Sequence, residues 1–492
     1  MSSNTLPRCL TNVISKTQEQ PISNIILPRK NCRLADHRGA TPLTPKKLSI
    51  SRPIVRLSLA SFTTYAVQLS RYLLVFTLLA AVARAEILVG LAQTDITPPP
   101  GGLTTGYASA QPTDGVHDPV TARVVLLKSE QSYVALVSCD LCIFNSAWLH
   151  EQMPKLGIDR LLLMNTHTHA GPKLSQEDFP SADKPWRQTV EERILAAIQQ
   201  AQSSLFTGYF AASESQIQLG YNRLVQRGNF AVTHFENPER IPYGSVDPQI
   251  GVIRVTDSDS KTRAVLVNYA CHPVVLGPRN IKISADYPGV MRDLVEQELG
   301  DEVMCVFVQG GGGDINPLFL ARDDDRTGDF DVVQRMGSML AAEVLRALTF
   351  IKDERGISND FRSMSSVSSF RNRFNAEDEL TLGVSTLLIN DDIGIVTMPG
   401  EPFHQFQLYI RQYSSVPHMY LFGYCCNGGY DWPSYLPDLA SAARGGYGAS
   451  DTTKAEVGSG EKLVNDGLVQ LFKLQGRLKA EPVRHTFETK PD

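Results

Sequence analysis

From residue 86 onward, short apolar runs alternate with longer segments in which apolar and polar positions recur with a helical period. The short runs are bounded by turn-forming residues, and they predict strands. Several of them are apolar at successive positions, which is typical of central strands that are buried on both faces. The predicted strands are Val120–Leu127, Tyr133–Ser138, Leu161–Met164, Gln249–Val255, Arg263–Tyr269, Val303–Val308 and Ile393–Met398.

The longer segments predict helices over Arg187–Ser204, Pro288–Leu299, Val332–Phe350 and Glu461–Lys479. Strands interleaved with helices indicate an α/β fold, which we expect to be a single layered domain of mixed β-sheet with flanking helices. No internal repeat and no Pro/Ser-rich linker divides this region, so we assign residues 86–492 to one domain.

The first 85 residues differ from the rest and predict a leader. The apolar run Tyr72–Val82 is too short to span a bilayer as a helix, and Ala83-Arg84-Ala85 follows it with the small-x-small pattern that signal peptidase accepts. We therefore expect a secretory signal peptide that is cleaved after Ala85, and a secreted or periplasmic mature protein. A short N-terminal membrane anchor or a buried helix is the alternative interpretation of the same run.

The charge distribution excludes one class of partner. Residues 1–85 hold 12 Lys and Arg against two Asp and Glu, which leaves 35 basic and 50 acidic residues in the remainder. A protein this acidic repels phosphate backbones, so we expect no nucleic-acid partner.

The segment after Leu161–Met164 carries the strongest chemical signal. The buried strand runs into Asn165-Thr-His-Thr-His-Ala-Gly-Pro172. In an extended backbone, residues i and i+2 project to the same side, so His167 and His169 would face one point, and imidazole is a common zinc ligand. Two hydrogen-bonded surface histidines are the simpler interpretation of an isolated His-x-His pair.

Other apolar strands also end in groups that can bind a metal or transfer a proton. His272 follows one strand, Asp314 follows a strand and the glycine run 310–313, and Glu401 follows Pro399-Gly400. Each has a structural explanation when it is taken alone. Their shared position at strand ends predicts one cleft, with a metal site, at one edge of the sheet.

Two common enzyme motifs do not fit the sequence. The glycine run continues as Asp-Ile-Asn-Pro rather than Gly-Lys-Ser/Thr, and Asp314 would repel a phosphate, so the segment is not a phosphate-binding loop. No G-x-S-x-G motif is present, so a serine mechanism of the α/β-hydrolase type has no support.

The ordered set of motifs resembles the catalytic region of the neutral/alkaline non-lysosomal ceramidases, which are zinc amidohydrolases that cleave the N-acyl bond of ceramide. The resemblance extends over nearly all of residues 86–450. The matching segments are Gly90–Pro99 with Gly106-Tyr-Ala, Gly115–Arg123, Asn165–Pro172, Tyr221–Arg223, Asn268–Pro273, Gly313–Pro317, Pro399–Glu401 and Tyr435–Pro437.

The resemblance implies a Zn²⁺ ion bound by His167, His272, Glu401 and Tyr435. Tyr430 is close by in the sequence, but Tyr435 has the Leu-Pro context and the spacing to Tyr447-Gly-Ala-Ser that match the family. These ligands would support hydrolysis of an amide bond by metal-activated water.

The resemblance also implies the catalytic residues. His169 would act beside the metal as an acid/base or substrate-orienting group, and Arg223 and Tyr447 would contact the scissile carbonyl or its oxyanion. Asp314 and Asn316 complete the set. Asn316 stands where ceramidases have a Ser that is implicated in catalysis, and its amide could donate a hydrogen bond to an oxyanion.

Three functions are compatible with these features. The first is hydrolysis of a ceramide-like lipid, with a peripheral contact to membranes. The second is hydrolysis of another amide or ester on the same metal site. The third is a secreted binding protein with a degenerate site, in which Asn316 marks the loss of catalysis. Since the sequence ends soon after the last motif, we expect it to lack the C-terminal β-sandwich domain of longer ceramidases.

Overall fold

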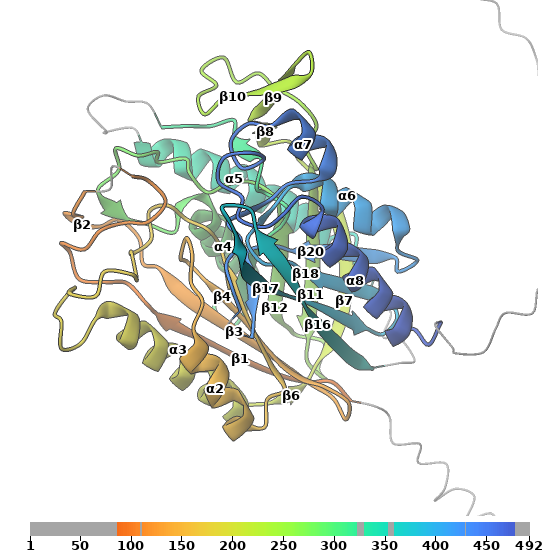
Figure 1. The fold of residues 1–492 in the computed structure, drawn as a ribbon. Coiled ribbons are helices and arrows are strands. Elements are labelled where there is room, and N and C mark those ends of the chain that lie inside the picture. The colour runs from red at the N-terminus through yellow and green to blue at the C-terminus, as the bar shows by residue number, and fades with distance from the viewer. Residues whose placement is uncertain (1–85, 109–110, 322–328, 353–358, 429, 478–492) are drawn as a thin grey trace, which may run out of the picture. The chain divides into compact units, whose positions relative to one another are not determined.

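The computed structural model describes residues 86–477 apart from 109–110, 322–328, 353–358 and 429 (Figure 1). The predicted signal peptide and its cleavage site lie outside these residues. Every strand and helix predicted above is present, with ends that shift by up to five residues, and residues 478–479 of the last predicted helix lie outside the described part of the chain. The mixed α/β class is therefore confirmed, whereas the assignment of residues 86–492 to one domain stays a prediction.

The strands form several sheets instead of one, and three of the sheets are large. The six-stranded sheet has the order β21-β5-β4-β3-β1-β6. Its strands are β1 (Leu88–Asp95), β3 (Thr121–Lys128), β4 (Tyr133–Cys139), β5 (Arg160–Asn165), β6 (Phe206–Thr207) and β21 (Cys425–Asn427).

Two further sheets have four strands each. The first, in the order β14-β12-β11-β7, contains β7 (Tyr209–Gln216), β11 (Gln249–Thr256), β12 (Thr262–Tyr269) and β14 (Met304–Gln309). The second, in the order β16-β17-β18-β20, contains β16 (Phe361–Asn372), β17 (Asn375–Ile389), β18 (Ile393–Thr397) and β20 (His418–Phe422).

Four two-stranded ladders complete the described sheets. They pair β2 (Gly115–Val116) with β13 (Lys282–Ile283), β8 (Gly220–Asn222) with β15 (Ile315–Pro317), β9 (Leu224–Arg227) with β10 (Phe230–Thr233), and β19 (Glu401–Pro402) with β22 (Tyr435–Leu436).

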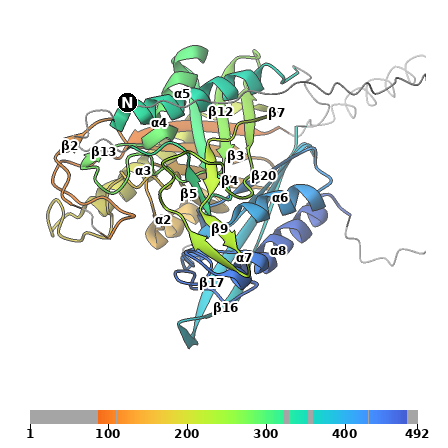
Figure 2. The same ribbon diagram turned by 90° about the horizontal axis from the view of Figure 1, so that it is seen from above.

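Helices cover the outer faces of the large sheets. They are α2 (Ala147–Gln152), α3 (Trp186–Ser203), α4 (Asp286–Leu299), α5 (Asp329–Leu348), α6 (His404–Tyr413), α7 (Leu439–Arg444) and α8 (Ser459–Leu474), with a short 3₁₀ turn at Met153–Leu156. Figure 2 shows α4 and α5 on one side of the described residues and α6 and α8 on another. In the part of the chain that the structure describes, no helix combines the length and the apolar character needed to cross a bilayer.

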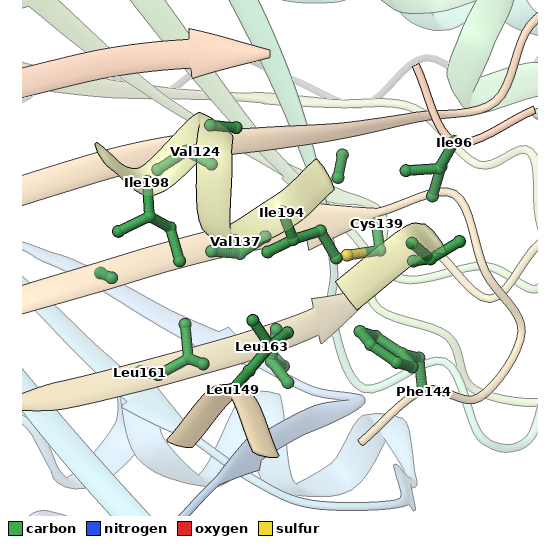
Figure 3. Packing of buried hydrophobic residues seen from close by; sticks show 14 of the residues in the cluster. Ile96, Val124, Val137, Cys139, Phe144, Leu149, Leu161, Leu163, Ile194 and Ile198 are labelled. Atoms are coloured by element: carbon green, nitrogen blue, oxygen red, sulfur yellow. The ribbon is translucent and has the colours of Figure 1, made fainter. Parts of the chain in front are cut away.

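The side chains of β3 show how the layers are built. Val124 points into the core beneath α3, where Ile194 and Ile198 pack over it (Figure 3), whereas Val125 points into the core shared with the two four-stranded sheets. Since successive side chains of a strand alternate between faces, a strand buried on both faces must be apolar at every position. This explains why the strand predictions succeeded.

Candidate metal centre

Three buried side chains converge from three different parts of the fold, and we call them the three-donor cluster: His167, His272 and Glu401. His167 follows β5 of the six-stranded sheet, and His272 follows β12 of a four-stranded sheet. Glu401 begins β19, whose parallel pairing with β22 places Glu401 beside Tyr435. The expected convergence at strand ends is present, but the ends belong to separate sheets rather than to one edge.

The distances within the three-donor cluster are those of groups that share a ligand. Glu401 Oε2 lies 3.0 Å from His272 Nε2 and 3.4 Å from His167 Nε2. Zinc binds His nitrogen and carboxylate oxygen at about 2.1 Å, so two ligands of one tetrahedral ion lie about 3.4 Å apart. All three residues are at least 95% shielded from solvent.

Backbone carbonyls fix which ring nitrogen of each histidine faces Glu401. His167 Nδ1 lies 2.7 Å from the carbonyl oxygen of Cys142, and His272 Nδ1 lies 2.7 Å from that of Gly312. Since a carbonyl only accepts hydrogen bonds, each Nδ1 must carry the hydrogen, and the lone pair of each neutral ring sits on Nε2. Two lone pairs and a carboxylate oxygen then face one another, an arrangement that a bound metal cation, or a proton on one of the rings, makes favourable. The donor set therefore fits a zinc ion.

The charge states of Glu401 and His272 agree with this arrangement, whereas that of His167 does not: burial would lower its pKa, but Cys142 and Glu401 outweigh burial and raise the pKa well above its usual value. Burial alone would raise the pKa of Glu401, but His167 and His272 outweigh it and hold the pKa well below its usual range. Burial, together with the nearby Arg223 cation, lowers the pKa of His272 to about 4. An ionised carboxylate and a neutral imidazole are the forms that bind a metal.

His169 lies beside the three-donor cluster, but not for the reason given by the sequence pattern. Its Nε2 is 3.2 Å from His167 Nε2. The backbone of His167 is in the left-handed region, with φ of 69°, so the two residues do not form the extended pair that we expected. The left-handed residue turns the chain, and the two rings meet edge to face with centroids 4.9 Å apart. His169 Nδ1 is buried without a hydrogen-bond partner among the described residues.

Arg223 places its guanidinium cation next to the three-donor cluster. Its Nη2 donates to the carbonyl oxygen of Gly313 at 2.6 Å, and its Nη1 donates to Asn316 Oδ1 at 3.2 Å. The guanidinium carbon lies 5.2 Å from the ring centres of both Tyr435 and Tyr447. The structure therefore brings together Arg223, Asn316, Tyr435 and Tyr447, as expected from the sequence.

Asp314 is placed differently from the other candidates. It is buried and does not line the cavity that contains the three-donor cluster. Its carboxylate accepts from His404 Nδ1 at 2.7 Å and from Asn222 Nδ2 at 2.7 Å. Its backbone carbonyl accepts from the amide of Arg223 at 2.9 Å. Asp314 thus lies behind Arg223 and holds it, rather than facing the cavity.

One cavity of about 1070 Å³ contains these groups. Apart from Asp314, all of the candidate site residues line it: His167, His169, Arg223, His272, Asn316, Glu401, Tyr435 and Tyr447. Its apolar lining includes Ile143, Phe235 and Trp432. The volume lies close to the upper end of the range of cavities that bind small organic ligands.

Sequence reasoning gave no role to three residues that shape the site. Tyr107 packs edge to face on His169, with ring centres 4.8 Å apart. Its neighbour Gly106 has a positive φ, and any Cβ there would collide with the His169 ring. His404 pairs with Asp314. Of the three, Gly106 and Tyr107 had a signal in the sequence, because they stand in one of the matching motifs.

Comparison with known proteins supports the family expected from the motifs. A model of the neutral/alkaline non-lysosomal ceramidase N-terminal region matches residues 87–332. Neutral ceramidase A of Dictyostelium discoideum is 26% identical over 257 residues, which are 46% of this chain and 35% of that protein. Neutral ceramidase of Drosophila pseudoobscura pseudoobscura is 23% identical over 270 residues, which are 49% of this chain and 38% of that protein.

Solved structures share the fold. The neutral ceramidase of Pseudomonas aeruginosa and a ceramidase complexed with C2 each superpose with a TM-score of 0.63 at 15% identity. Each comparison covers 81% of this chain and 76% of the solved chain. The sequence matches to the curated relatives extend over little more than a third of their length. Since the family model spans half of the sequence, the chain belongs to the neutral/alkaline non-lysosomal ceramidase family.

Proposed function

We propose that this protein is a zinc-dependent amidohydrolase that cleaves the N-acyl bond of a ceramide-like lipid. The observation that carries the proposal is the three-donor cluster, in which two imidazole rings fixed by backbone carbonyls direct Nε2 at one carboxylate oxygen. Membership in the ceramidase family supports the choice of an amide substrate. We further propose that the protein acts outside the cytoplasm, after cleavage of the predicted leader at Ala85.

In this proposal, His167, His272, Glu401 and Tyr435 hold the zinc ion. When bound, zinc supplies a Lewis acid that lowers the pKa of water to about 7 and so provides a nucleophile at neutral pH. The neighbouring protein groups must then orient the amide, stabilise negative charge on its oxygen and carry a proton to the leaving nitrogen.

Arg223 is placed to stabilise the oxygen of the scissile carbonyl. Its guanidinium is held by Gly313 and Asn316 and sits against the rings of Tyr435 and Tyr447, so it is oriented before substrate binds. A fixed cation in a buried cavity stabilises developing negative charge more strongly than the same cation in water. Asn316 has an orienting role here, since its Oδ1 accepts from Arg223.

His169 is placed to move the proton. It lines the cavity beside the three-donor cluster, and Tyr107 packs against one edge of its ring. The unpartnered Nδ1 and the Nε2 near His167 give it two nitrogens for exchanging a proton.

The test measures both the metal content and the turnover of the purified protein. Purified protein is analysed for zinc and assayed for fatty-acid release from a soluble short-chain ceramide, beside simple N-acyl amides and esters. We expect one zinc per chain and release of acid from the short-chain ceramide. If the zinc-loaded protein hydrolyses only another amide or an ester, the assignment of ceramide as substrate is wrong. If it turns over none of these compounds, a binding function is favoured.

A further inference from the structure

We propose that the β9–β10 hairpin, together with the cavity mouth beside it, docks the protein on a zwitterionic phospholipid bilayer. We call this surface the hairpin patch: Val225, Arg227, Phe230, Val232 and Phe235. The inference rests on the proposed lipid substrate, and it adds the surface by which such a substrate would be reached.

The hairpin has one packed face and one exposed apolar face. In the pairing register, Val232 lies opposite Val225 and Phe230 opposite Arg227, so these four residues share a face. Phe230 is 58% exposed and Val232 39%. Figure 1 shows the hairpin at the edge of the described residues, next to α7.

The opposite face is fixed to the catalytic cavity. A Cβ on Gly446 would collide with Leu224 and approach Thr233, and Thr233 Oγ1 accepts from the amide of Tyr447 at 3.0 Å. Tyr447 lines the cavity. The strands that carry Phe230 and Val232 are held in place by contacts with the cavity wall. Their side chains are therefore exposed on a fixed hairpin and not on a mobile loop.

Exposed apolar side chains continue from the hairpin to the cavity. Phe235 is 49% exposed, lines the cavity and packs edge to face on Tyr447, with ring centres 5.0 Å apart. Ile143 is 41% exposed and lines the same cavity. Two separate segments thus place exposed apolar residues at the mouth of the cavity. Apolar residues that are scattered singly over a surface do not gather around a cavity in this way.

Charge favours a zwitterionic surface over an anionic one. Arg227 and Arg240 are exposed in this region, and Glu236 and Glu239 in the same segment offset them. The rest of residues 86–492 is strongly acidic and would be repelled by anionic lipid. A bilayer of phosphatidylcholine accepts apolar side chains without that repulsion, and Arg227 can contact its phosphate groups.

The experiment measures flotation of the full chain with phosphatidylcholine vesicles that contain no sphingolipid. We compare wild type, F230S/V232S and the control F350S. Phe350 follows α5, is also exposed and has an arginine, Arg346, over its ring, but it belongs neither to the cavity lining nor to the hairpin. We expect F230S/V232S to bind about tenfold or more weakly, because two buried apolar side chains are lost from the bilayer contact. F350S should bind like wild type.

Two further measurements separate this inference from other outcomes. Phosphatidylserine in the vesicles should not strengthen binding, and turnover of soluble short-chain ceramide should be equal in the three proteins. Wild type that does not float, a double variant that floats equally well, or a double variant that loses self-association in sedimentation would overturn the inference. Failure to hydrolyse soluble ceramide would contradict the proposed function alone, since flotation requires no catalysis.

Discussion

Two buried histidine–carboxylate groups in this protein are built in opposite ways. In the three-donor cluster, Nδ1 of each histidine donates to a backbone carbonyl, and the carboxylate of Glu401 faces Nε2. In the Asp314–His404 pair, Nδ1 of the histidine faces the carboxylate directly, at 2.7 Å. In the pair, each group has its partner within the protein, whereas the cluster offers three donors that could hold a metal ion. The tautomer fixed by the backbone, and not the type of residue, distinguishes the candidate metal site from the ion pair.

The largest expected effect separates the two groups by metal content. We expect His272→Ala to lose both zinc and turnover, because it removes one donor and leaves Glu401 buried opposite a single imidazole. His404→Gln should keep its zinc. The measurements are metal analysis and hydrolysis of a soluble short-chain ceramide. Zinc added to metal-free protein should raise the free energy of unfolding by about 2.7 kcal/mol at a hundredfold excess over Kd for wild type and His404→Gln. Retention of stoichiometric zinc by His272→Ala would contradict the assignment.

The second prediction concerns the stability that the Asp314–His404 pair supplies. Burial opposes ionisation of both groups, but each partner outweighs it, so the pKa of His404 is raised and that of Asp314 is lowered. The His404 contribution is complete below its unfolded pKa of about 6.5 and is lost as pH rises through the folded value. The Asp314 contribution is complete above about 4 and is lost as pH falls.

His404→Gln should therefore destabilise the protein most between about pH 4 and pH 6.5, by about 3 kcal/mol, since it leaves a buried carboxylate without its cation. The measurement is chemical denaturation from pH 3 to pH 9. The matched control is His418→Gln, whose partner Glu214 is nearly a third exposed, and its effect should stay below about 1 kcal/mol. A loss of stability that is constant across the pH range would show that the pair acts through packing and not through charge.

The sequence predicted some strands of the fold but not others, and it did not predict how the strand ends are arranged. Strands such as Tyr133–Cys139 were predictable because burial on both faces requires apolar residues throughout. The long strand Phe361–Asn372 was not, since it is rich in serine and only half-buried along most of its length. Residue type also fails to show the sheet to which a strand belongs. The strand ends were therefore predicted to converge at one edge of a single sheet, whereas they come from separate sheets.

The residues that form the candidate site were predictable, but the orientation of their backbone and side chains was not. His167, His272 and Glu401 follow strands and occur in recognisable motifs, so their convergence could be expected. Two features depend on backbone geometry that no residue pattern specifies: the left-handed conformation of His167, and the direction of the Asp314 side chain towards His404. The second arises from a long-range contact, since Asp314 and His404 are 90 positions apart in the sequence.

The third prediction tests whether Arg223 belongs to the chemistry or to the metal site. Arg223→Lys keeps the positive charge but loses the planar fork that contacts Gly313 and Asn316 at the same time. We expect kcat to fall about a hundredfold to a thousandfold, as when a donor to an oxyanion is removed, while zinc content stays unchanged. Steady-state kinetics on soluble short-chain ceramide provide the measurement. A raised KM with unchanged kcat would show that Arg223 binds substrate without stabilising the transition state.

The smallest effect is expected at Asn316, where the family resemblance implies a serine in the ceramidases. In this protein Asn316 accepts from Arg223, but Arg223 also donates to Gly313 and is enclosed by aromatic rings, so its position has independent support. Asn316→Ser should lower kcat by less than about tenfold, the equivalent of roughly one hydrogen bond. Asn316→Asp should lower it further, because a carboxylate would neutralise the cation beside the scissile carbonyl. A collapse of turnover in Asn316→Ser, with zinc retained, would instead place Asn316 in direct contact with the reacting atoms. The ordering of the two variants therefore distinguishes an orienting residue from a catalytic one.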